Sequence, residues 1–454
     1  MYARQKVVVQ TGLSPLIALY LFFFLIPVEL SFYIGPLLIT PTRLFLILSF
    51  VPVMIFSFSN MKLRLEDYLF VLFVLWVSGA YFYKRGISGV EIAGQHFLEA
   101  TVSYFVARTF LKTTEDILAL AKWLTILISV LAFLAIPEAF SKYRFFHEVP
   151  EMITGFYYYI SDDTRFGMLR AASTFEHPIL FGLFASSMFI LLWFSSASAG
   201  QRMWIGAVCL TATFFSLSSA AFLVLIMQFF FIFIERVTRP ISKRMMIFTI
   251  LTVSFILILE FGSNQGAIRF LIGKLTLNPF TAYYRLLQWE YSIDDVMRHP
   301  FVGIRIVNWT RPYWMTDSID NHWLLAAMNS GMPSVALLWS AMVTILVKIY
   351  KAGHRHVDRR NQQLCLAWLI GISSLFMGGW TVAFFGKMLP IFMFFIGVGA
   401  AISRLENGEA DDDKVEKEND ESDENRQRFT RFENSRITGT VRNVPQNFTS
   451  SRRD

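Results

Sequence analysis

The sequence predicts an all-α integral membrane protein, a helical bundle that crosses the bilayer about twelve times. Hydrophobic residues make up 54% of the 454-residue chain, and its mean hydropathy is +0.47. Apolar runs of about 20 residues, the length that a helix needs to span a bilayer, recur along the chain. These runs are continuous and do not alternate with period two. They therefore favour helices, whose backbone groups pair within the segment, over a β-barrel.

The predicted membrane domain covers residues 1–404. The first span lacks a small-residue cleavage site, so we expect a retained helix and not a signal peptide. The span 94–111 contains three ionisable residues: we expect Arg108 to extend to the cytoplasmic surface, and His96 and Glu99 to border a cavity. The predicted spans are 14–34, 38–58, 66–83, 94–111, 117–137, 178–196, 203–217, 219–235, 244–261, 332–350, 363–381 and 388–404.

The distribution of lysine and arginine predicts the orientation, because short basic loops stay in the cytoplasm. Basic residues precede the first span and fill the second, fourth, sixth, eighth and tenth connections. The alternate connections at 35–37 and 218 are uncharged, and the eleventh carries only Lys387. We therefore expect both termini in the cytoplasm. The third connection disagrees with this pattern, because it carries Lys84 and Arg85.

Residues 405–454 differ in composition from the rest of the chain. They are first acidic and then rich in arginine, asparagine, serine and threonine, with few apolar residues to form a core. This composition predicts a disordered cytoplasmic tail. Cys209 and Cys365 lie in apolar segments and indicate neither disulfides nor a metal site. We assign the net charge of +7 to the loops and not to nucleic-acid binding.

Two polar loops interrupt the apolar runs, at about 139–177 and 262–322. Both are predicted to lie on the outer face of the membrane. The second carries six basic residues, and the first adds further arginines. Arginine presents a planar, permanently charged fork that matches phosphate oxygens, so these loops suit a lipid-linked phosphate or diphosphate. The alternative is that the arginines bind lipid headgroups or pair with the loops' own carboxylates.

Three short motifs occur in these loops. The first is RAASTFEHPILFG, from Arg170 to Gly182. The second is RLLQW, from Arg285 to Trp289, followed by HPFVG ending at Gly303. The third is DNHW, from Asp320 to Trp323, followed by Gly331-Met-Pro.

Together these motifs resemble the bacterial O-antigen ligase and O-antigen or exopolysaccharide polymerase family. The resemblance covers roughly residues 165–345, in motif order and sidedness. It implies a GT-C-like helical fold with a large helical outer loop in the bacterial inner membrane. It also implies an inverting glycosyl transfer that needs no metal or other cofactor. The donor would be an oligosaccharide on undecaprenyl diphosphate, and a chain-length regulator would be a further partner.

The resemblance also implies roles for individual residues. Arg170 and Arg285 would hold the diphosphate, whose negative charge grows as it leaves. Ligases have a histidine at the position of Asp320, and this difference favours a polymerase over a ligase. Either Asp320 or His322 would be the general base; only one of them is expected to face the site. The further candidate substrate-binding residues are Arg165, Arg298, Trp289, His177 and Glu176.

Several alternatives remain open at this stage. Glu176 and His177 are as compatible with a helix start as with an acid–base pair. Asp294 and Asp295 are a weak indication of a metal, which would need more oxygen ligands. A transporter or flippase for a lipid-linked glycan also fits a chain of many spans. However, the charges concentrate in the outer loops, and no internal repeat is visible.

Overall fold

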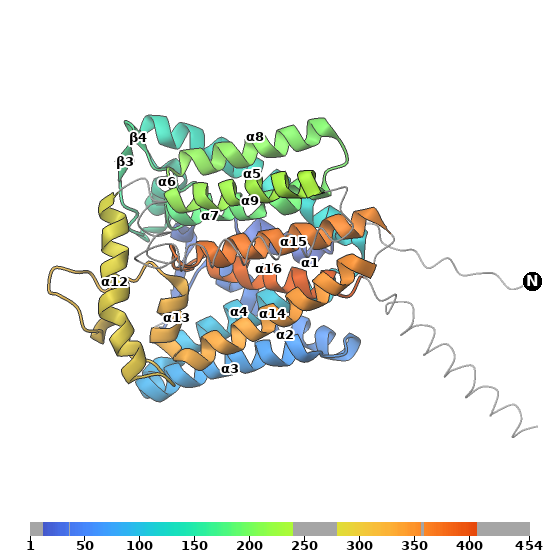
Figure 1. Ribbon diagram of the computed structural model, residues 1–454. Coiled ribbons are helices and arrows are strands. Elements are labelled where there is room, and N and C mark those ends of the chain that lie inside the picture. Colours follow the sequence, from blue (N-terminus) through green and yellow to red (C-terminus); the bar gives the residue numbers. More distant parts are fainter. Residues whose placement is uncertain (1–11, 36, 239–278, 356–357, 406–454) are drawn as a thin grey trace, which may run out of the picture. The chain divides into compact units, whose positions relative to one another are not determined.

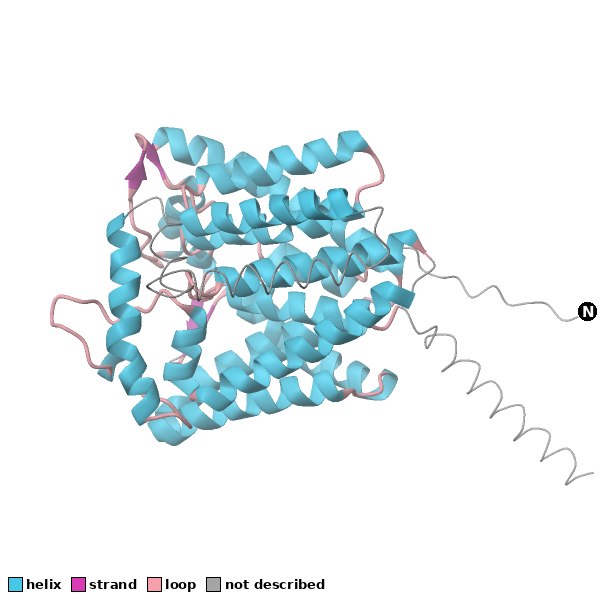
Figure 2. Cartoon of the chain, in the orientation of Figure 1, coloured by secondary structure: helices cyan, strands magenta, loops and turns pink. Residues whose placement is uncertain are grey.

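The computed structural model describes residues 12–35, 37–238, 279–355 and 358–405. The predicted span 244–261, the first part of the second polar loop (262–278) and nearly all of the predicted tail lie outside these residues. The described chain is mostly helical (Figures 1 and 2). This confirms the predicted helical class.

The elements follow the predicted order closely. The long helices are α2 (Pro41–Asn60), α3 (Leu65–Arg85), α4 (Val90–Phe110), α5 (Thr114–Ser141), α7 (Pro178–Ser195), α8 (Ala199–Phe215), α9 (Ser219–Thr238), α12 (Pro279–Arg298), α14 (Met332–Arg355), α15 (Arg359–Gly378) and α16 (Met388–Ile402). The short elements are α1 (Pro15–Phe23), α6 (Phe145–Thr154), α13 (His322–Ser330), the 3-10 turns η1 (Val28–Leu30), η2 (Gly86–Gly89) and η3 (Ile306–Asn308), and the hairpins β1–β2 (Phe32–Ile34, Leu37–Ile39) and β3–β4 (Thr164–Arg165, Met168–Leu169).

Six helical stretches of the described chain are long and apolar enough to cross a membrane, and are consistent with a multi-pass membrane protein. One of them, Leu65–Phe110, is α3 and α4 joined through η2 and packed side by side. The count of about twelve spans stays a prediction. The six stretches are Pro41–Asn60, Leu65–Phe110, Thr114–Ser141, Pro178–Ser195, Ser219–Thr238 and Met332–Gly353.

The predicted first span, 14–34, is wrong as a continuous helix. Helix α1 ends at Phe23, and nine residues of helix rise only about 14 Å, roughly half of a bilayer core. The chain then passes Pro27, which begins η1, and enters the β1–β2 hairpin. Glu29 in η1 is buried against His147 of α6, with a 2.7 Å contact between the carboxylate and the imidazole. Apolar content alone did not reveal this break.

Helices α7 and α16 form the centre of the bundle. Nearly every residue of each is buried. Helix α7 packs against α5, α8, α9 and α15, and α16 packs against α4, α14 and α15 (Figure 1). Gly397 of α16 lies so close to the Tyr104 carbonyl of α4 that an added side chain would collide with it. The two central helices are therefore fixed by their neighbours, and so are the residues at which they begin.

The prediction that Arg108 extends to the surface is wrong. Its side chain is fully buried and forms a two-pronged ion pair with Asp67 of α3, in which Nε and Nη2 each lie 3.0 Å from a carboxylate oxygen. The Tyr104 hydroxyl donates to the same carboxylate at 2.6 Å. Because the Asp67 carboxylate on α3 neutralises the guanidinium, Arg108 can stay buried without contact with water. Glu99 is likewise paired, with Arg43 of α2 at 3.1 Å.

We predict that Asp67→Leu destabilises the protein severely, by about 3–5 kcal/mol, because it leaves the Arg108 guanidinium buried without its counter-charge. The control is Asp162→Asn. Asp162 pairs with Arg144, but its side chain is 81% exposed, so that change should cost less than about 1 kcal/mol. Thermal unfolding of the detergent-solubilised protein measures both. Equal melting temperatures for the two variants would contradict the assigned role of the buried pair.

Candidate functional site

Three helices begin at one end of the bundle, which we call the site end. They are α7 at Pro178, α13 at His322 and α16 at Met388. The His322 N–H donates to the Gly379 carbonyl at 2.7 Å, and the Lys387 N–H donates to the Glu176 carboxylate at 3.3 Å. These bonds hold the three starts together. Helix N-termini carry partial positive charge, so the site end favours anions even before its side chains are considered.

The first polar loop is built around Glu138 at the end of α5. Its carboxylate accepts the backbone N–H groups of Ala172 and Ser173, at 3.0 and 2.8 Å, and the Arg144 guanidinium at 2.5 Å. Arg144 also binds the Ser161 carbonyl at 2.8 Å and Asp162 at 3.2 Å. Arg144 is therefore occupied by its own loop. Together with Glu138 it fixes the chain on either side of the β3–β4 hairpin.

That hairpin presents two of the predicted arginines. Arg170 directly follows β4 and is 4% exposed. Its contacts are long: 3.6 Å to the Asp163 carboxylate, whose side chain is 63% exposed, and 3.5 Å to the Ser216 carbonyl. Arg165 in β3 donates to the Leu217 carbonyl at 2.8 Å. Neither guanidinium is saturated by these contacts, because arginine has five N–H donors.

Arg285 reaches the same region from α12. It is 7% exposed, and its Nε lies 3.5 Å from the Asp320 carboxylate. That separation is an ion-pair contact and is too long for a good hydrogen bond, so the buried Nε–H has no hydrogen-bond acceptor. Gln288, one turn along the helix, holds the adjoining loop by accepting the Asp320 N–H at 3.0 Å and donating to the Ser318 carbonyl at 2.9 Å.

Arg165, Arg170 and Arg285 affect one another's pKa through their charges, and we call these three residues the arginine cluster. Burial, followed by the field of Arg165, lowers the pKa of Arg170 to about 10, and Arg144 and Arg285 contribute in the same direction. Burial and the field of Arg165 also lower the pKa of Arg285, against the opposing effect of Asp320. The cations therefore lie close enough to repel one another. Such an arrangement is costly unless an anion joins it.

Trp289 lies one helical turn beyond Arg285 and fixes the position of α12. Its ring packs on Trp380, with 5.9 Å between ring centroids, and Trp380 packs in turn on Trp339 and Phe376. Trp380 belongs to the connection between α15 and α16, residues 379–387. We interpret Trp289 as a packing residue that positions Arg285, which differs from its predicted contact with the substrate.

His322 and Asp320, the alternative bases, have very different surroundings. His322 is 7% exposed, stacks on Phe384 at 4.4 Å and accepts the Phe384 N–H at 3.4 Å. Burial lowers its pKa to about 3, so it stays neutral at physiological pH. The Asp320 side chain is 41% exposed and faces Arg285. Of the two groups, only Asp320 is both next to the arginine cluster and open to solvent.

Glu176 and His177 lie where the first loop enters α7. His177 caps that helix by accepting the Ile179 N–H at 3.1 Å, and burial, followed by the charge of Arg170, lowers its pKa to about 4. Glu176 is buried against Gly386 and Lys387. The Lys387 ammonium donates to the carbonyls of Phe24, Ile26 and Thr174. His177 is therefore the cap of α7, and Glu176 contacts the residue at which α16 begins.

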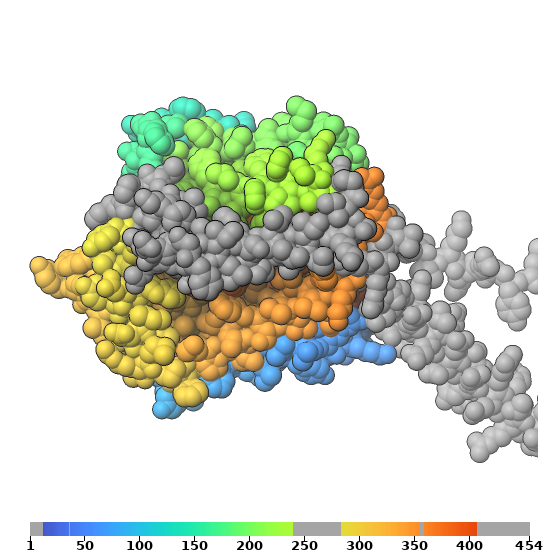
Figure 3. Space-filling view, in the orientation of Figure 1, coloured from blue at the N-terminus to red at the C-terminus, as the bar shows by residue number. Residues whose placement is uncertain are grey.

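The structure does not bring Arg298 to the arginine cluster. It ends α12, and the helical rise places it roughly 20 Å along the axis from Arg285. Its side chain is 61% exposed and contacts Asp295 at 3.3 Å. Asp295 in turn accepts the backbone and hydroxyl groups of Thr310. Figure 3 shows α12, in yellow, at one end of α14. Asp295 therefore links the end of α12 to the loop at Thr310.

The second and third motifs are joined by a backbone clamp, which comprises Pro300–Ile304 and Met328–Met332. The Ile304 N–H donates to the Met328 carbonyl at 2.6 Å, and the Met332 N–H donates to the Pro300 carbonyl at 2.7 Å. Gly303 and Gly331 have φ of +67° and +79°, and side chains there would collide with the facing backbone. These two glycines therefore allow the backbones of the two segments to lie close together.

Lys84 explains the connection that disagreed with the predicted orientation. Its ammonium group donates to the Ile304 carbonyl at 3.1 Å and to the Asn329 carbonyl, both in or beside the backbone clamp. Arg305 donates back to the Lys84 carbonyl at 3.0 Å. The charge of Lys84 is thus used for a structural contact at the site end. It does not indicate on which side of the membrane this connection lies. Loop composition could not separate these two uses of a lysine.

Within the described ranges, no group of three or more His, Cys, Asp or Glu residues is arranged to hold a metal. Comparison of the chain with models of known protein families and with curated proteins gives no match. The functional interpretation therefore depends on the motifs and on the geometry of the site end.

We predict that Gly331→Ala disrupts the backbone clamp, because the added carbon would collide with the Phe301 carbonyl in addition to the strain of positive φ. The control for positive φ is Gly155→Ala, where φ is +70° and no atom lies within 4 Å. The control should lose about 1–2 kcal/mol from strain alone. Melting temperature and protein abundance distinguish the two variants. Indistinguishable losses would exclude the clamp as the reason for glycine.

Proposed function

We propose that this protein is a glycosyltransferase that polymerises repeat units of a bacterial surface polysaccharide. Its donor is an oligosaccharide on undecaprenyl diphosphate, and the reaction takes place at the outer face of the inner membrane. One observation carries the proposal: Arg165, Arg170 and Arg285, from two loops far apart in the sequence, affect one another's pKa, and Arg285 contacts Asp320 just before α13 begins. The three motifs support the glycan substrate.

A diphosphate suits this cluster for physical reasons. Holding mutually repelling cations close together destabilises the folded protein. A ligand with two adjacent phosphates offsets this repulsion by accepting several charge-assisted hydrogen bonds. The buried, unpaired Nε–H of Arg285 and the long contacts of Arg170 leave donors available. The helix N-termini add positive potential in the same place. The nearby apolar helices suit the polyprenyl chain.

The step we propose is an inverting displacement. An acceptor hydroxyl oxygen attacks the anomeric carbon of the donor sugar, and the bond from that carbon to the diphosphate oxygen breaks. The hydroxyl proton passes to the Asp320 carboxylate. The electron pair of the broken bond stays on the lipid diphosphate, whose growing charge the arginine cluster stabilises. Binding of the diphosphate to Arg285 would also release Asp320 from its ion pair.

The acceptor distinguishes a polymerase from a ligase, since both use the same donor. An aspartate in place of the ligase histidine favours a second lipid-linked repeat over lipid A core. The test is the state of the lipid-linked glycan in cells that lack the protein. Single repeats on the outer face would support a polymerase, and long polymer on the carrier a ligase. Repeats trapped on the cytoplasmic face would replace this proposal with a flippase.

We predict that Arg170→Ala and Arg285→Ala each reduce polymer formation by about 10²–10³, because each removes a fixed charge that stabilises the leaving diphosphate. Arg298→Ala, on the same helix as Arg285 but outside the cluster, should retain normal polymer. Polymer length and yield are measured at matched protein abundance in the membrane. Normal polymer from either cluster variant would remove the arginine cluster from the mechanism.

We predict that Asp320→Asn is inactive while the protein accumulates normally, and that the pH–rate profile between pH 5 and 8 shows no inflection from His322. The second expectation follows from the pKa of His322 near 3, which keeps that ring neutral throughout this range. Purified protein with a synthetic lipid-linked repeat gives the profile. Activity of Asp320→Asn near that of the wild type, or an inflection near pH 6.5, would favour a histidine base.

A further inference from the structure

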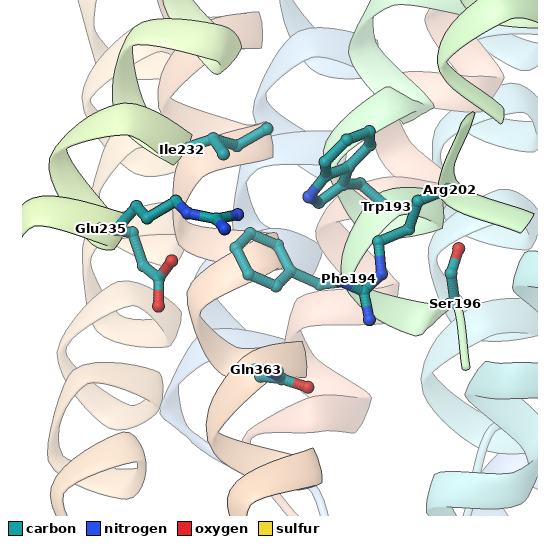
Figure 4. Close-up of a pocket in the computed structure, with 8 residues that line it drawn as sticks. Trp193, Phe194, Ser196, Arg202, Ile232, Glu235 and Gln363 are labelled. Atoms are coloured by element: carbon teal, nitrogen blue, oxygen red, sulfur yellow. The ribbon is translucent and has the colours of Figure 1, made fainter. Parts of the chain in front are cut away.

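A polar cavity lies at the end of the bundle opposite the site end. It is a small cavity of about 40 Å³, formed where α7 and α9 end and where α8 and α15 begin (Figure 4). The 18 residues of α7 separate it from the site end by roughly 27 Å. Its lining residues are Trp193, Phe194, Ser196, Arg202, Ile232, Glu235, Arg236 and Gln363.

The cavity gathers more basic than acidic groups. Arg202 of α8 and Arg236 of α9 both line it, and within the described chain no carboxylate lies at ion-pair distance from either guanidinium. Arg360 lies beside the cavity, where it donates to the Ser195 carbonyl at 2.8 Å, and its buried Nε–H has no acceptor. Glu235 is the single acidic residue of the lining. The local charge therefore favours an anion.

An exposed apolar stripe leads away from this cavity along α9. Ile226, Phe230, Phe233 and Val237 recur every three or four residues and are between 52% and 65% exposed. That spacing places them on one face of the helix, roughly a quarter turn around the axis from Arg236, which lines the cavity. A ligand with a charged end and a long apolar end matches this arrangement, with the charged end at the guanidinium groups.

We propose that the cavity binds the phosphate of an anionic phospholipid whose acyl chains lie along the α9 stripe. Arg202 and Arg236 hold the phosphodiester. The indole of Trp193 lies at the level of the headgroup, as tryptophan commonly does at a membrane interface. The predicted orientation places this end at the cytoplasmic leaflet, whose anionic lipids attract basic residues. The site is independent of the arginine cluster and of the proposed glycosyl transfer.

The experiment counts lipids bound to the purified full-length protein by native mass spectrometry after detergent exchange has removed co-purified lipid. Phosphatidylglycerol and phosphatidylcholine are titrated separately. We expect the first phosphatidylglycerol to bind about tenfold more tightly than phosphatidylcholine, and the Arg202→Gln/Arg236→Gln variant to lose that preference. Arg359→Gln, an exposed residue at the same end that does not line the cavity, is the control.

A second variant tests the apolar half of the site: Phe233→Ser should weaken both lipids by a similar factor and leave the headgroup preference unchanged. Equal affinity of the wild type for both lipids would overturn the proposal, as would an unchanged preference in the double arginine variant. Displacement of phosphatidylglycerol by millimolar inorganic phosphate, with no effect of Phe233→Ser, would identify a site for a soluble phosphate instead of a lipid.

Discussion

The site end depends on how Lys387 is bound. Its ammonium group donates to three backbone carbonyls, at Phe24, Ile26 and Thr174, and its own N–H donates to Glu176. Those carbonyls belong to the broken first span and to the entrance of α7. In a protein of this composition, backbone carbonyls at such breaks need donors from within the chain, because the bilayer offers none. One lysine thus supplies the hydrogen bonds for backbone carbonyls after the end of α1 and before the start of α7.

The connection that ends at Lys387, residues 379–387, also contacts the other elements of the site end. Gly379 and Phe384 hold His322 through backbone hydrogen bonds, and Trp380 packs on Trp289. Residues 379–387 therefore contact the first polar loop, the start of α13 and helix α12, and fix the positions of all three. Arg170 and Arg285 extend from elements fixed in this way. This rigidity allows like charges to be kept close, since freely moving arginines would separate until their repulsion was small.

The sequence allowed the helical class, most helix positions and the two polar loops to be predicted. It did not reveal the end of α1 at Phe23, because the chain stays apolar to Ile34 and only Pro27 and Glu29 mark the change. Nor did it reveal Glu138, Arg144 and Lys387 as the residues that organise the site end. Each appeared as an isolated charge, and its importance comes from backbone partners that are distant in the sequence. The pairing of Arg108 with the Asp67 side chain escaped prediction because these two residues are also distant in the sequence.

The motif residues divide into two groups by what they contact. Gly303, Gly331, Trp289 and His322 make packing and backbone contacts within the protein, and these contacts give each of them a structural role. Arg170, Arg285 and Asp320 differ from them: they are buried or paired at long distance and keep free hydrogen-bonding capacity, and the two arginines repel each other. A folded chain retains such groups at a cost in stability. That cost is the strongest physical reason to place an anionic substrate among them, because the substrate supplies the partners that the protein withholds.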